Sequence, residues 1–101
     1  MAELAVISPS DAHSYETLTI SSTALPCTAS KLLATTDEIF VTIETDAIRM
    51  LFDGSTPTAA VGHKFAAGTS FELKGRPNIN NLLMIRVTTD ATVTITYKRG
   101  L

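Results

Sequence analysis

Apolar and polar residues alternate along much of this chain, which is the pattern of half-buried β-strands. In residues 15–21 (YETLTIS), Leu18 and Ile20 fall on one face and the hydroxyl side chains on the other. Residues 38–44 (EIFVTIE) and 47–53 (AIRMLFD) alternate in the same way on either side of a Thr45-Asp46 turn. A period of two residues is typical of strands. We therefore predict a strand in each segment and a β-hairpin made by the last two.

The second half of the chain continues this pattern. Residues 69–74 (TSFELK) and 92–98 (TVTITYK) alternate cleanly, and the first of them ends at the turn residues Gly75-Arg76-Pro77-Asn78. Residues 82–88 (LLMIRVT) are apolar on both faces, which predicts a central strand or one whose outer face meets another subunit. For this strand we expect Leu83 and Ile85 to face the core and Leu82, Met84 and Arg86 to face outward.

The succession of short strands predicts the architecture. Turn residues at regular spacing between such strands are typical of a single antiparallel β-sandwich or a jelly-roll-like barrel, here of six to eight short strands. Residues 22–37 are expected to be a loop with at most one helical turn, because that segment is too short for an independent helix. We expect residues 1–14 to form an N-terminal arm and residues 15–101 to form the β-sandwich domain.

Composition and charge narrow the range of partners. A chain of 101 residues is long enough for one small domain, and a mean hydropathy of +0.22 indicates apolar surface that a partner covers. A formal net charge of -2 argues against nucleic acid as a partner. The sequence has no long apolar run and no basic leader, so we expect synthesis in the cytoplasm and no membrane partner.

Residues that could carry catalysis lack the partners that their chemistry needs. His13 and His63 are the only histidines, and neither belongs to a nucleophile motif. The single cysteine, Cys27, follows Pro26 in an apolar context and is interpreted as a small buried side chain. The acidic candidates lie at strand ends or outward positions, where a solvated carboxylate is the ordinary explanation: Glu44, Asp46, Asp53, Glu72 and Asp90. We predict no catalytic residue, no metal site and no cofactor.

The long connection at residues 53–68 is the strongest candidate for a functional element. Asp53-Gly54 is a turn signal, and Pro57 ends any regular strand pairing there. A connection of this length is longer than an ordinary hairpin loop and is typical of binding elements. We expect Asp53 to cap the turn. The side chains that we expect to contact a neighbouring protein are Thr56, Thr58, His63 and Lys64.

A second candidate surface lies on the strands. If the protein forms a symmetric oligomer, the contact residues are expected to be those that face away from the predicted core. These residues are Arg49, Leu51, Leu82, Met84 and Arg86.

The ordered combination of several short motifs resembles a family of small bacteriophage virion proteins. The resemblance spans residues 16–98. It is carried by Ile48-Arg49, Asp53-Gly54, Pro57-Thr58, Gly62-His63, Gly68, Leu73-Lys74-Gly75, Ile79, Ile85-Arg86, Asp90-Ala91-Thr92 and Thr96-Tyr97. It implies a β-sandwich virion component, non-enzymatic, most often a capsid decoration or cement protein that binds the major capsid protein. It also implies a homo-oligomer, with a trimer favoured.

Other functions remain open at this point. A tail or head-tail connector component would fit the same resemblance. The chain is also similar to small β-sandwich modules of chitobiase-type glycosidases, which carry an arginine-containing strand leading into Asp-Gly-Ser-x-Pro-Thr. A carbohydrate-binding module normally stacks sugar rings on aromatic side chains, whereas this chain has no Trp and only two Tyr. Binding of a glycan or host surface by residues 53–68 therefore ranks second.

Overall fold

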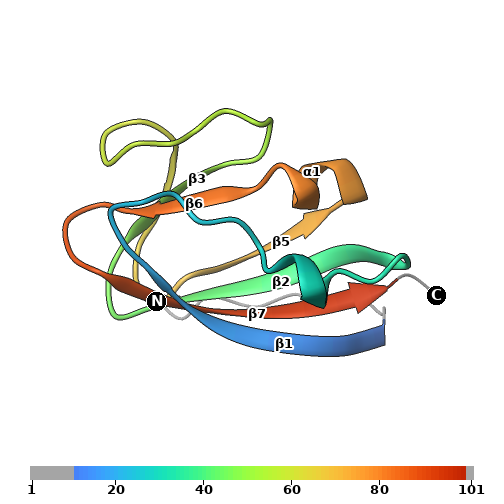
Figure 1. The fold of residues 1–101 in the computed structure, drawn as a ribbon. Helices are drawn as coiled ribbons and strands as arrows, with labels where there is room; N and C mark the ends of the chain where they lie inside the picture. Colours follow the sequence, from blue (N-terminus) through green and yellow to red (C-terminus); the bar gives the residue numbers. More distant parts are fainter. Residues whose placement is uncertain (1–10, 100–101) are drawn as a thin grey trace.

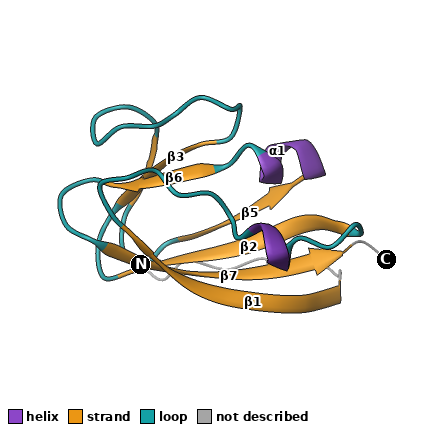
Figure 2. Cartoon of the chain, in the orientation of Figure 1, coloured by secondary structure: helices purple, strands orange, loops and turns teal. Residues whose placement is uncertain are grey.

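The computed structural model describes residues 11–99 as two packed layers of β-structure (Figure 1). Its strands are β1 (Asp11–Ile20), β2 (Thr36–Glu44), β3 (Ile48–Leu51), β4 (His63–Phe65), β5 (Ser70–Lys74), β6 (Leu83–Arg86) and β7 (Ala91–Arg99). A 3-10 turn, η1 (Ala29–Lys31), and one short helix, α1 (Arg76–Asn80), lie in the connections (Figure 2).

The two layers are a four-stranded sheet in the order β1-β7-β2-β5 and a three-stranded sheet in the order β4-β3-β6. Every pairing is antiparallel. The predicted all-β, antiparallel sandwich is therefore confirmed. The strands predicted at residues 15–21, 38–44, 69–74 and 92–98 are present as β1, β2, β5 and β7, with shifted ends.

The predicted hairpin between residues 38–44 and 47–53 is wrong. β2 and β3 lie in different sheets, so the chain crosses the sandwich at Thr45-Asp46. Thr45 has a positive φ of 69°, and the Ala47 N–H donates to Asp46 Oδ1 at 2.7 Å. Both strands bury their apolar side chains, and these face each other across the core when the strands belong to opposite layers. Alternation predicts the strands but cannot choose between a hairpin and a crossing.

Two further expectations need correction. The turn predicted at residues 75–78 is the start of helix α1, whose Pro77 lies in the first turn, where a missing N–H costs nothing. β1 begins at Asp11, so residues 11–14 belong to the sheet rather than to the predicted arm. The remaining residues of that arm, 1–10, lie outside the described residues.

The core lies between the two sheets, and the face of β6 that carries Met84 points into it. Met84 is opposite Met50 in the β3–β6 register, and both side chains are buried. Leu82 and Met84 are 0% exposed, so the expectation that they face outward is wrong. Ile85 is buried as well, on the opposite face of β6. Because β6 has apolar residues on both faces, the sequence pattern could not indicate which face points toward the core.

Candidate functional site

The connection from β3 to β4 folds back over the outer face of the three-stranded sheet. In Figure 1 it forms the yellow-green loop beside β3 and β6. Pro57 in this connection is buried, and Ile85 on β6 is 9% exposed although it faces away from the core. Within the predicted range 53–68 the structure adds a short strand, β4, which pairs with β3. The free part of the connection is therefore residues 52–62, hereafter the clamped loop.

Arg49 holds the clamped loop in place. It lies on β3, the middle strand of its sheet, at a register position that faces away from the core. Its Nε donates to the carbonyl oxygen of Ala59 at 3.0 Å, and its Nη1 donates to that of Gly62 at 2.9 Å. One planar guanidinium thus binds both sides of the loop tip, as its fork of donors permits. The loop consequently has a defined shape in the absence of a partner.

Gly62 allows the loop to approach β3 closely. Its φ is +133°, which favours glycine. A Cβ at this position would lie 3.2 Å from the Met50 carbonyl oxygen and 3.3 Å from the Cβ atoms of Arg49 and Pro57. The backbone geometry and the close packing therefore both require glycine here, and both support the path that Arg49 fixes.

The predicted cap at Asp53 is confirmed. The Ser55 N–H donates to Asp53 Oδ1 at 2.9 Å, an Asx turn, and hydrogen bonds from the Ser55 backbone and hydroxyl lower the pKa of this exposed carboxyl. At the other end of the loop the His63 ring stacks on Phe52, with centroids 5.9 Å apart and an interplanar angle of 27°. His63, Lys64, Thr56 and Thr58 are all exposed. Whether they contact another protein stays a prediction.

The tip of the clamped loop is a tight turn that presents apolar groups to solvent. The backbones of Thr58 and Val61 exchange hydrogen bonds of 3.0 and 3.2 Å, and the Ala60 N–H donates to Thr58 Oγ1 at 3.2 Å. Val61 is 57% exposed, and Ala59 and Ala60 are exposed beside it. An ordered apolar tip is a surface that gains free energy when a partner covers it.

A groove of about 420 Å³ runs between the loop tip and the end of β6. Three of the lining residues are apolar, three carry hydroxyl groups and one is an arginine. Its lining residues are Ser22, Thr58, Ala59, Ile85, Arg86, Val87 and Thr88.

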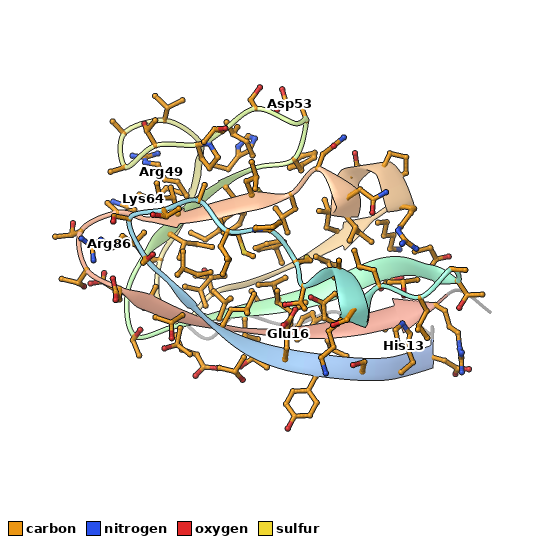
Figure 3. The ribbon with its side chains drawn as sticks, in the orientation of Figure 1. His13, Glu16, Arg49, Asp53, Lys64 and Arg86 are labelled. Atoms are coloured by element: carbon orange, nitrogen blue, oxygen red, sulfur yellow. The ribbon has the colours of Figure 1, made fainter. Side chains whose placement is uncertain are left out.

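The five predicted contact residues on the strands lie in different environments. Leu82 and Met84 belong to the core and are removed from the candidate surface. Arg49 faces outward as expected, but its guanidinium is engaged by the clamped loop. Leu51 is half-buried. Arg86 is half-exposed, lines the groove and forms an ion pair with Asp90. In Figure 3, Arg49, Lys64 and Arg86 lie at one end of the molecule, away from His13.

A polar cluster at the inner face of β1 was not predicted from the sequence. Glu16 Oε1 accepts a 2.6 Å hydrogen bond from the Thr28 hydroxyl, and Oε2 accepts bonds from the Thr28 N–H and the Tyr97 hydroxyl. Burial alone would raise the pKa of Glu16, but these hydrogen bonds outweigh it and lower that pKa. The residues of this polar cluster are separated by up to 81 positions in the sequence, so no local motif marks the cluster.

The cluster joins segments rather than activating a nucleophile. Cys27 is buried beside Tyr97, and burial raises the pKa of its thiol to about 11. A neutral, buried thiol is a poor nucleophile at physiological pH, in agreement with the structural interpretation of Cys27. His13 Nε2 lies 2.8 Å from Thr36 Oγ1, which also accepts the Leu33 N–H. Both contacts tie β1 and the 22–37 segment to the sheet.

In residues 11–99 no three His, Cys, Asp or Glu side chains are grouped so that they could hold a metal ion. The same residues include no helix that is long and apolar enough to cross a membrane. Comparisons with protein-family models, curated proteins and solved structures find no match to this chain.

Proposed function

We propose that this protein is a non-enzymatic bacteriophage virion protein that decorates the capsid and stabilises it by binding neighbouring copies of the major capsid protein. The observation that carries the proposal is the clamped loop. Arg49 and Gly62 hold its tip in one shape, and the tip presents Val61 to solvent beside an open groove. A preformed surface loses little conformational entropy on binding, which favours recognition of a repeated rigid lattice.

The sequence resemblance to virion proteins supports the same proposal independently. It includes Ile48-Arg49 and Gly62-His63, which supply the clamp and the close approach of the loop. The groove also bears on the alternative of glycan binding. None of its seven lining residues is aromatic, so it offers no ring for a sugar to stack on. A capsid protein surface is therefore the partner that the loop and groove fit better.

The test is binding of the purified protein to phage capsids that lack it. We expect co-sedimentation with the capsids and a raised capsid melting temperature. Val61→Asp should weaken that binding at least tenfold, because the change places a charge where apolar surface is buried. Ser30→Asp adds the same charge at an exposed position on η1, away from the loop, and should bind like the unmodified protein.

Several outcomes would contradict the proposal. Equal binding by the Val61→Asp and unmodified proteins would remove the loop from the interface. Binding to purified tails but not to capsids would favour the tail or connector alternative. Specific retention on a glycan array, lost in Val61→Asp, would favour a glycan-binding module. Failure to bind any of the three would refute a decoration role.

A further inference from the structure

The two sheets have four edges, and three of them are short or covered. β4 has three residues and β5 has five, and α1 packs against β5. The edge of β6 is bridged by Leu25, whose N–H and carbonyl bond with Met84, and the Arg86 N–H donates to Ser21. Natural sheets commonly guard their edges in these ways against pairing with other chains.

β1 is the exception among the described edges. It is ten residues long, and within residues 11–99 it pairs with β7 on one side and with no strand or bridge on the other (Figure 1). Its sequence, DAHSYETLTI, contains no Lys, Arg, Pro or Gly. Its exposed residues are Asp11, Ala12, Tyr15, Thr17 and Thr19, and Tyr15 is 66% exposed. From Tyr15 to Thr19 the outer face of this edge carries no charge, and a long edge of this kind is a template for strand addition.

The hydrogen-bond pattern shows which backbone groups face that open edge. The Thr92 N–H donates to Thr45 Oγ1, just beyond β2, so the N–H and C=O of Thr92 point toward β2. These directions alternate along a strand, so Val93 and Ile95 point toward β1, where they meet Leu18 and Glu16.

The same alternation fixes the directions on β1. The backbone N–H and C=O groups of Leu18 and Glu16 point toward β7. The same groups of the residues between and beside them point away from β7. The N–H and C=O groups of Tyr15, Thr17 and Thr19 therefore face the open edge. The register shift between Ala12 and Ser14 leaves these positions in a regular part of the strand.

We propose that this edge pairs with β1 of a second copy of the chain, antiparallel, with Thr17 opposite Thr17 on a two-fold axis. In that register Tyr15 is opposite Thr19 of the partner, and every open backbone group of the three residues is satisfied. A register centred on Glu16 would set two carboxylates directly opposite, and one centred on Leu18 would leave Tyr15 unpaired.

The side chains agree with this register. On the outer face, each Tyr15 ring would lie against a Thr19 methyl, and aromatic side chains favour β-branched cross-strand neighbours. On the inner face, Glu16 would lie opposite Leu18, so no like charges meet. The Glu16 carboxylate is already bound within its own chain by Thr28 and Tyr97.

The dimer goes beyond the proposed function and does not depend on it. β1 belongs to the four-stranded sheet, whereas the clamped loop covers the three-stranded one, so pairing would leave both loops free. It also differs from the trimer expected from the resemblance, for which the strand contacts included Leu82 and Met84, now assigned to the core.

The first test is sedimentation of the full chain over a concentration series. We expect a monomer–dimer equilibrium that Thr17→Pro shifts at least tenfold toward monomer, because proline removes a donor that faces the open edge. Thr17→Ala keeps the donor and should dimerise nearly as well. A chain that stays monomeric at millimolar concentration, or dimers unaffected by Thr17→Pro, would overturn the proposal.

Two measurements keep the proposal testable if Thr17→Pro misfolds. Thr17→Cys should form a disulfide-linked dimer under mild oxidation, since paired residues of this kind have Cα atoms about 5.5 Å apart. Thr42→Cys, on a central strand, should not. Hydrogen exchange should protect the amides of Tyr15, Thr17 and Thr19 only at high concentration. Protection that does not depend on concentration would mean that the edge is covered within one chain, and the dimer would be rejected.

Discussion

The clamp on the loop predicts a measurable loss of stability when Arg49 is replaced by methionine. Arg49→Met keeps the aliphatic part of the side chain but removes both hydrogen bonds, at 3.0 Å to Ala59 and 2.9 Å to Gly62. A hydrogen bond from a charged group contributes about 1.5–3 kcal/mol when it is shielded from water. Arg49 is only half-buried, so we expect a combined loss of about 1–3 kcal/mol. In a domain of this size that lowers Tm by about 5–15 °C.

The assay is thermal unfolding followed by circular dichroism, together with limited proteolysis of the folded protein. Released from Arg49, the loop should be cut faster at residues 53–62 than in the unmodified protein. Arg86→Met is the matched control, because Arg86 makes an exposed ion pair with Asp90 that should be worth less than about 1 kcal/mol. Equal melting temperatures for the two variants, with no new cleavage in the loop, would refute the clamp.

Three further predictions follow from individual contacts. The pKa of Glu16 is lowered below its usual 4.5, so its contribution to stability is present above pH 4.5 and is lost as pH falls through the lowered value. In urea titrations, the loss of unfolding free energy at acid pH should be smaller for Glu16→Gln than for the unmodified protein. Gly62→Ala should cost more than Gly68→Ala in the same titration, since both have positive φ but only Gly62 is crowded; equal costs would contradict the close packing. Cys27, with its pKa raised to about 11, should react with a thiol reagent at pH 8 only upon unfolding, and rapid reaction of the folded protein would be inconsistent with its burial.

The clamped loop separates the residues that fix its path from the residues that it exposes. The sandwich core is made by the inner faces of the sheets, and Ile85 on the outer face of β6 is covered by the loop rather than by the other sheet. Residues at the tip, such as Val61, Ala60 and Thr58, contribute little to the core. Changes at the tip should therefore leave the fold intact, whereas Arg49, Pro57 and Gly62 preserve the path of the loop.

The sequence by itself determined the class of the fold and the position of most strands. Alternation around Ile39 and Val41, and around Val93 and Ile95, is a local signal, because a strand sends successive side chains to opposite faces. The Asx turn at Asp53 is equally local, since its donor lies two residues away. The sequence also marked the connection after β3 as unusually long.

Only the tertiary structure decided how these elements meet. It placed β2 and β3 in opposite sheets, turned Met84 inward, and brought Glu16 to Tyr97 across 81 positions of sequence. The open edge of β1 likewise depends on which strand takes the outermost place in its sheet. The placement of β2, β3 and Met84 buries apolar side chains, and the contact between Glu16 and Tyr97 satisfies a buried hydroxyl group. A local pattern cannot contain that information, because the competing arrangements expose the same residues at the same spacing.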